Sequence, residues 1–188
     1  MAILGKIIKT IVHSSKVWST QTRNAGEQQK DTLKQLMFRA KDTAFGRHYG
    51  FGELLKAHQD PRQVFAQQLP VYDYQKIHQV WWHRCLAGED NICWPGKTRY
   101  FALSAGTTEG RSKQIPVSEA MLKAIRRSSL RMIMHLRNYQ LPASLFEKSI
   151  FMLSGATSLQ KQDGHFQGEI SGISAANVPT WSSFYSPA

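Results

Sequence analysis

The segment Ser104–Lys113, which reads SAGTTEGRSK, combines the residue types that bind a polyphosphate. Glycine tolerates backbone conformations closed to other residues, so backbone N–H groups can approach an anion closely. The serine and threonine hydroxyls donate hydrogen bonds, and Arg111 and Lys113 supply positive charge. Each charge-assisted contact contributes about 1.5–3 kcal/mol when water is excluded. Composition alone leaves two interpretations, a phosphate-binding loop or an ordinary polar loop of a β-hairpin.

The segment does not follow the Walker A pattern of nucleotide-binding proteins. That pattern places four residues between its glycines and a lysine directly after the second glycine. Here three residues separate Gly106 from Gly110, and Lys113 comes three residues later. Ile115 and Pro116 favour extended backbone, so a helix is not expected to start at the lysine. We therefore predict a loop that joins two strands.

Helices are predicted for most of the chain before this loop. Apolar residues at helical spacing indicate the first two helices. Asp60 is the candidate N-cap of the third, and the fourth is expected to start at Asp73. The N-terminal helix is expected to pack on the rest of the protein, with attachment to a membrane surface as the alternative. The predicted helices cover residues 3–12, Gln28–Thr43, 61–68 and 73–86.

Strands enter the pattern from about residue 97. Aromatic and β-branched residues predict strands at Thr98–Leu103 and Gln114–Val117, and Ser118 can cap a helix that runs to about Asn138. Another strand is predicted at Lys148–Leu153, followed by loops and short strands. The fold class is therefore α/β, with a helical region at about 1–96 and strand-loop-strand-helix units at about 97–188. Because no finishing element closes the pattern, we expect an incomplete domain.

The composition is that of a folded, basic protein. Of its 188 residues 41% are hydrophobic, and the net charge of +11 favours anionic partners without choosing among them. No apolar run is long enough for a transmembrane segment, and no signal peptide is expected. Cys85 and Cys93 form no CxxC pair, which predicts free thiols, no metal site and a cytoplasmic location.

Four further segments accompany the loop: DTAFG at 42–46, PVYDY at 70–74, GEDNICWPG at 88–96, and GEISGI at 168–173 with NVP at 177–179. Together with SAGTTEGRSKQIP at 104–116, they resemble the auxin-responsive Gretchen Hagen acyl acid amido synthetases and their bacterial relatives. The family's loop reads approximately SSGTTxGxxKxIP. The chain is identified as the N-terminal part of a bacterial-type member of this family, within the adenylate-forming superfamily.

The resemblance implies an ATP-dependent ligase. Family members convert a small carboxylic acid and ATP into an acyl-adenylate, release pyrophosphate, and pass the acyl group to an amino acid or amine. The loop would surround the β- and γ-phosphates, with Mg²⁺ alongside and Lys113 as the catalytic residue. The implied ATP-binding residues are Ser104, Ala105, Gly106, Thr107, Thr108, Gly110 and Lys113.

This sequence departs from the family pattern in two ways. The family's second serine is Ala105 here, which removes a side-chain donor and leaves a backbone N–H. The family's other ATP motifs and its mobile C-terminal domain lie beyond the segments matched here. We therefore expect residues 1–188 to be a partial N-terminal adenylation domain without the C-terminal domain, and to be inactive alone.

The helix predicted after the loop carries a basic stripe. Lys123, Arg127 and Arg131 recur every four residues. In the family this helix borders the acyl pocket, so the resemblance implies that Arg131 binds the substrate carboxylate. The alternative is a solvated cationic face, to which Arg126, Arg127 and Arg137 are assigned.

Two other functions stay open. The positive charge allows a nucleic-acid-binding module, but no zinc finger, RRM or KH signature occurs and the basic residues are scattered, so no nucleic-acid partner is expected. The third possibility is a non-catalytic fragment that serves only in interactions.

Overall fold

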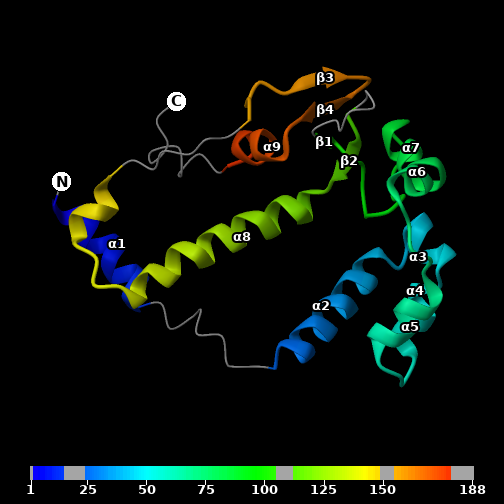
Figure 1. The fold of residues 1–188 in the computed structure, drawn as a ribbon, viewed down its shortest axis with the longest axis horizontal. Helices are drawn as coiled ribbons and strands as arrows, with labels where there is room; N and C mark the ends of the chain where they lie inside the picture. Colours follow the sequence, from blue (N-terminus) through cyan, green and yellow to red (C-terminus); the bar gives the residue numbers. More distant parts are fainter. Residues whose placement is uncertain (1, 15–23, 105–111, 149–154, 179–188) are drawn as a thin grey trace. The chain divides into compact units, whose positions relative to one another are not determined.

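The computed structural model describes residues 2–14, 24–104, 112–148 and 155–178 (Figure 1). The chain divides into two compact units, and each is described by itself. The helix unit consists of Met1–Gln21, Glu119–Leu159 and Glu169–Ala188, and the sheet unit consists of Thr22–Ser118 and Gln160–Gly168.

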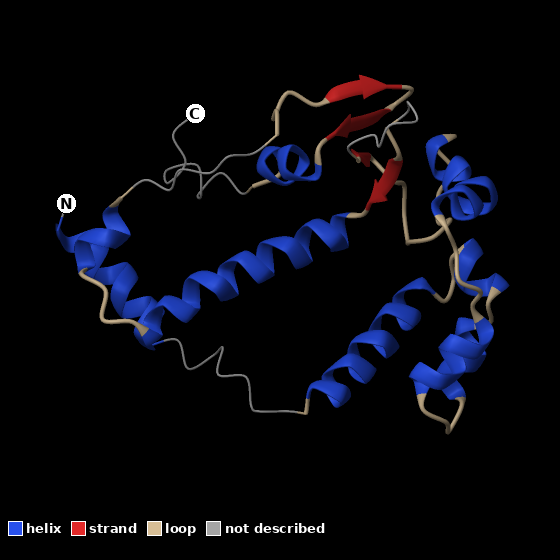
Figure 2. Ribbon diagram, viewed as in Figure 1, coloured by secondary structure: helices blue, strands red, loops and turns tan. Residues whose placement is uncertain are grey.

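A four-stranded sheet of order β2-β1-β4-β3 carries the candidate loop (Figure 2). Strand β1 (Tyr100–Leu103) is antiparallel to β2 (Gln114–Val117) and parallel to β4 (His165–Gly168), and β4 is antiparallel to β3 (Gln160–Gln162). Both strands predicted to flank the loop are therefore confirmed. Phe101 of β1 has no exposed surface, which makes β1 the buried centre of the sheet.

Helices precede the sheet within the sheet unit. The predicted cap at Asp60 is confirmed, since its carboxylate accepts the Arg62 N–H at 2.9 Å. Asp73, the expected start of the next helix, is the N-cap of that helix and accepts the Lys76 N–H at 2.8 Å. The second helix begins at Ala25, earlier than predicted, because Asn24 caps it. The helices are α2 (Ala25–Ala40), α3 (Ala44–His48), α4 (Phe51–Lys56), α5 (Pro61–Gln68), α6 (Tyr74–Ile77), the π-helical η2 (His78–Trp82) and α7 (His83–Leu86).

Aromatic side chains form the centre of the helical part of the sheet unit. The Phe45 ring lies 4.8 Å from that of Tyr49, 5.8 Å from Phe51 and 5.2 Å from Trp81, measured between ring centroids. Tilted and edge-to-face pairs of this kind contribute about 0.5–1.5 kcal/mol each beyond the area they bury. Phe45 belongs to the DTAFG segment, so this segment anchors the core.

The helix unit comprises α1 (Ala2–Ser14), α8 (Glu119–His135), η3 (Leu136–Asn138), η4 (Ala143–Glu147) and α9 (Ile170–Ala176). Helix α1 packs on η4, as expected of a helix that packs on the protein: the Gly5 N–H donates to Glu147 Oε1 at 3.1 Å. On another side of α1, Ile7 and Ile11 are about half exposed.

The prediction of loops and short strands after residue 155 is confirmed by β3 and β4 but is wrong for residues 170–176. Residues 170–176 form α9, although Gly172 interrupts the apolar pattern. A Cβ at Gly172 would lie 2.2 Å from the Ala156 carbonyl oxygen, so a close backbone contact explains this glycine, which marks no break. The predicted strand Lys148–Leu153 falls, apart from Lys148, outside the described residues.

The DTAFG segment turns the chain sharply between α2 and α3. The buried Thr43 hydroxyl donates to the Ala40 carbonyl at 2.6 Å and accepts the Gly46 N–H at 3.0 Å. A Cβ at Gly46 would lie 1.9 Å from the Ala40 carbonyl oxygen and 2.9 Å from Lys41 Cα. Because both atoms belong to the backbone, they cannot move aside cheaply, and only glycine fits this position.

Replacing Gly46 with alanine therefore destabilises the sheet unit. We expect Gly46→Ala to lower the free energy of unfolding by about 2 kcal/mol or more, measured by urea denaturation of the chain. The matched control is Gly52→Ala, also near a helix start, where an added Cβ meets nothing within 4 Å. That change should be neutral or stabilising by up to about 1 kcal/mol. Equal effects of the two substitutions would contradict this account of Gly46.

Candidate phosphate-binding site

The candidate loop is the connection of a closed β-hairpin. The register of β1 and β2 runs from Tyr100 opposite Val117 to Leu103 opposite Gln114. One step further, the Ser104 N–H donates to the Lys113 carbonyl at 3.1 Å. The prediction of a loop between two strands is confirmed, and the two ends of the loop are held side by side.

The structure describes only the two ends of this loop. Ser104 is half-buried at the end of β1, and Lys113 is exposed just before β2. The other predicted phosphate-binding residues lie outside the described residues, namely Ala105, Gly106, Thr107, Thr108 and Gly110. The structure thus brings the first and last predicted residues together and leaves the five between them as predictions.

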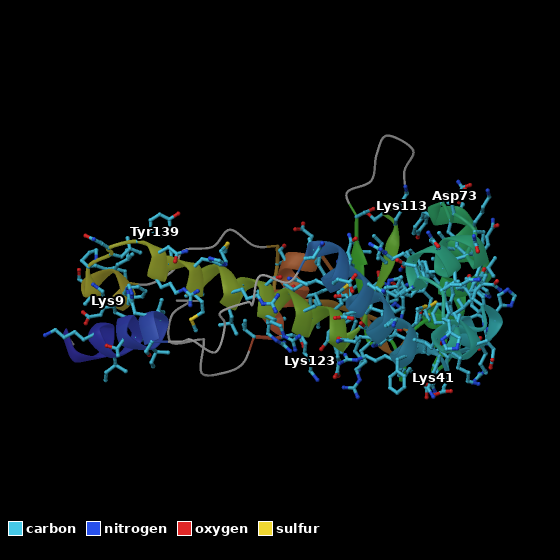
Figure 3. All side chains as sticks on the ribbon, turned by 90° about the horizontal axis from the view of Figure 1, so that it is seen from below. Lys9, Lys41, Asp73, Lys113, Lys123 and Tyr139 are labelled. Carbon is cyan, nitrogen blue, oxygen red and sulfur yellow. The ribbon has the colours of Figure 1, made fainter. Side chains whose placement is uncertain are left out.

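Tyr74, the first residue of α6, contacts the base of the hairpin. Its hydroxyl accepts the Gln114 N–H at 2.9 Å, and the Lys113 Nζ atom lies 5.3 Å from its ring centroid. Asp73, labelled with Lys113 in Figure 3, caps the same helix. The PVYDY segment resembles a family element, but no sequence signal connects its final tyrosine with the lysine thirty-nine residues away.

Strand β4 supports β1 on the side away from the loop's second strand. The two strands run parallel, with Tyr100 beside Phe166 and Ala102 beside Gly168. The buried His165 ring stands edge-on to Phe101 at 4.8 Å, and His165 Nε2 lies 2.7 Å from Gln167 Nε2. These contacts fix the strand from which the loop departs.

Two other family segments of the sheet unit, DTAFG and GEDNICWPG, are joined to each other. The N–H groups of Ala44 and Phe45 donate to the carbonyls of Asn91 and Ile92 at 2.8 and 2.9 Å, which joins DTAFG to GEDNICWPG. Asn91 adopts a positive φ of 55°, and its side-chain oxygen accepts the Gly96 N–H at 2.8 Å. These contacts hold the backbone turns of the two segments.

Tyr72 of PVYDY belongs to the same unit. Its hydroxyl is hydrogen-bonded to that of Tyr49 and accepts the Trp81 Nε1–H at 3.2 Å. Burial and the hydrogen bond to Tyr72 together raise the pKa of Tyr49 to about 12. The Tyr49 hydroxyl therefore stays protonated at neutral pH and is hydrogen-bonded within the core.

A sequence model described as the GH3 family N-terminal domain matches residues 15–187 of this chain. The chain belongs to the GH3 family. This is the Gretchen Hagen family that the sequence segments resemble, and the observed mixed α/β fold is that of its N-terminal domain.

Solved structures of GH3 proteins share this fold. A structure of GH3.15 acyl acid amido synthetase is 18% identical, with a TM-score of 0.63 over 94% of this chain and 29% of that one. A structure of AtGH3.15 acyl acid amido synthetase in complex with 2,4-DB is 20% identical, with a TM-score of 0.53 over 89% and 27%. This GH3 chain thus spans less than a third of the length of either. Among curated proteins, none matches it.

The cations of α8 in this GH3 chain do not form one uniform solvated face. Lys123, Arg127 and Arg131 are exposed along the helix. Arg126 is partly buried instead, and its Nη1 donates to the Asn177 carbonyl at 2.7 Å. The assignment of Arg126 to a solvated face is therefore wrong, because the C-terminal end of α9 lies within its reach. No pattern along the sequence signals that contact.

The part of the chain that the structure describes holds no group of three or more His, Cys, Asp or Glu side chains suited to a metal ion. None of its helices is both long and apolar enough to cross a bilayer.

Cys85 and Cys93 are free thiols that interact with each other. Cys85 is buried at 3% exposure, and Cys93 is partly buried against the same core cluster. The hydrogen bond from Cys93 stabilises the Cys85 thiolate and lowers the pKa of Cys85 to about 7, while the same contact raises the pKa of Cys93. The pair therefore loses one proton readily and the second only with difficulty.

Thiolate absorbance at 240 nm measures this arrangement. We expect one thiol of the folded chain to titrate near pH 7. Cys93→Ala removes the donor and should shift that midpoint toward the ordinary thiol range of about 8.5. Because the folded-state pKa lies below the unfolded one, ionisation of Cys85 adds stability as pH rises above about 7, and this contribution is lost as pH falls.

Cys85→Ala serves as the control and should abolish the step near pH 7. An unchanged low midpoint in Cys93→Ala would show that Cys93 is not the cause.

Proposed function

We propose that this chain supplies the phosphate-binding part of an ATP-dependent acyl-adenylating ligase, an acyl acid amido synthetase. GH3 membership supports the ligase class, and the solved structures of the same fold are described as acyl acid amido synthetases. The observation that carries the proposal is the closed hairpin, which delivers a Ser/Thr/Gly-rich loop with Lys113 at its exposed end.

The chemistry explains why such a loop is needed. A carboxylate is a poor electrophile until one of its oxygens becomes part of a better leaving group, which ATP provides by forming the acyl-adenylate. Two anions must be held together, and negative charge shifts onto the departing pyrophosphate. In this proposal Lys113 neutralises that charge as the catalytic residue, while the hydroxyl and N–H donors between residues 104 and 110 hold the phosphates.

The donor set of the described residues fits a phosphate better than a protein-bound metal. Ser104 and Lys113 offer a hydroxyl and an ammonium group, and the described residues form no acidic metal cluster. We therefore propose that Mg²⁺ accompanies ATP and is ligated mainly by its phosphates. Ala105 lacks the hydroxyl of the family's serine, which should weaken ATP binding without abolishing it.

The substrates follow from the ligase class. We propose a small carboxylic acid as acyl donor and an amino acid or amine as acceptor. Arg131 is exposed on α8 and carries the charge to bind the carboxylate of the acid. The free thiols favour a reducing compartment, and we place the enzyme in the cytoplasm on that ground.

Replacing Lys113 tests the proposal in a protein that joins these residues to the rest of a GH3-length enzyme. Lys113→Gln should lower kcat/KM for ATP by about 10- to 150-fold in an ATP–pyrophosphate exchange assay, because one charge-assisted contact is lost. Lys161→Gln, which removes a positive charge from an exposed position on β3, is the control and should change little. A Lys113→Gln enzyme with the parent's kcat/KM would overturn the proposal.

A second prediction concerns residues 1–188 alone. They cover 29% of the GH3.15 structure, and we expect the adenine and ribose contacts to come from the part not covered. The isolated chain should give no pyrophosphate exchange above a blank with any small carboxylic acid. Turnover by the isolated chain would refute this expectation and would place a complete nucleotide site within it.

A further inference from the structure

Tyr74 makes two contacts at the C-terminal end of the candidate phosphate loop, one with Gln114 and one with Lys113. Its hydroxyl accepts the Gln114 N–H at 2.9 Å, and its ring lies under the Lys113 ammonium group at 5.3 Å. We propose that Tyr74 is a positioning residue, which orients the Lys113 side chain toward the phosphates of ATP. This inference rests on the proposed function and adds a residue to it.

The hydrogen bond to Gln114 closes an otherwise open sheet edge. Strand β2 lies at the edge of the sheet, and the bond between Ser104 and Lys113 sets the alternation of its N–H groups. In an antiparallel pair, successive backbone N–H groups point alternately toward the partner strand and away from it. The N–H of Gln114 therefore points away from β1, and so does the backbone nitrogen of Pro116. Proline has no backbone N–H, and the N–H of Gln114 donates to the Tyr74 hydroxyl. This hydrogen bond anchors the edge strand β2 at the residue next to Lys113.

The Tyr74 ring is itself held in place. It packs on His78 with ring centroids 5.6 Å apart and edge-on to Trp82 at 5.9 Å. These residues lie four and eight positions along the same helical segment, whose first turn is capped by Asp73. The orientation of the ring is therefore fixed. The Lys113 side chain that packs on this ring has fewer conformations available to it before any ligand binds.

The nature of the contact suits a phosphate ligand. An aromatic face attracts an ammonium group through its quadrupole but carries no negative charge. Among the described residues Lys113 makes no ion pair, unlike Arg62 with Asp60. Tyr74 thus orients the cation and leaves its charge uncompensated, which a carboxylate at the same place would not do.

NMR of the chain tests the contact directly. With ¹³C-labelled lysine, the ε-CH₂ signal of Lys113 should be shifted upfield by the ring current. Tyr74→Phe keeps the ring and should keep the shift, whereas Tyr74→Leu should abolish it. Tyr139→Leu, an exposed tyrosine of the helix unit, is the control and should leave the signal unchanged.

A double-substitution cycle in the GH3-length enzyme tests the role. Tyr74→Leu should raise KM for ATP about two- to five-fold with Lys113 present, and should add nothing when Lys113 is already glutamine. A purely structural tyrosine would act equally in both backgrounds, and that result, or an unshifted Lys113 signal in the parent, would overturn the inference.

If Lys113→Gln leaves KM and kcat/KM for ATP unchanged, the proposed function fails, and so does the role of Tyr74 in phosphate binding. An intact ring-current shift would identify this case.

Discussion

The backbone hydrogen bond from Ser104 to Lys113 is the constraint on which the candidate site depends. It makes the loop the end of a hairpin, so the first and last candidate residues are neighbours although nine positions separate them. Donors that bind a polyphosphate must be placed before the ligand arrives, because reorganisation during the reaction would consume the stabilisation. Strand β1 lies between β2 and β4, and its residue Phe101 is fully buried, so the base of the hairpin is rigid enough for this placement.

Three family segments, DTAFG, PVYDY and GEDNICWPG, belong to the same unit as the hairpin and hold the core of that unit together. DTAFG and GEDNICWPG are joined through backbone hydrogen bonds, and Phe45 places the first of them against Trp81. Gly46 is needed because two backbone segments meet there. PVYDY divides its work: Tyr72 bonds to Tyr49 and Trp81 in the core, while Tyr74 reaches the hairpin.

What could be read from the sequence is what depends on neighbours along the chain. The cap at Asp60, the helix start at Asp73 and the strands beside the loop follow from local backbone chemistry, and all are present. Helix α9 was missed because Gly172 suggests a break, whereas its role is a close contact with Ala156. The hydrogen bond of Arg126 to Asn177 is not predictable from local sequence either, because the two residues are fifty-one positions apart. Local patterns do not encode such partners.

The net charge of +11 indicates a binding site only when the cations are sorted according to the groups they contact. Arg62 and Arg84 are paired with Asp60 and Glu89, and Arg126 with a backbone carbonyl, so these cations stabilise the protein's own structure. Lys113 is held by a neutral ring. Among the residues that the structure describes, Lys113 forms no ion pair, and an unpaired cation attracts an anion more strongly than one already paired. The arrangement, more than the excess of positive charge, distinguishes a phosphate site from a generally basic surface.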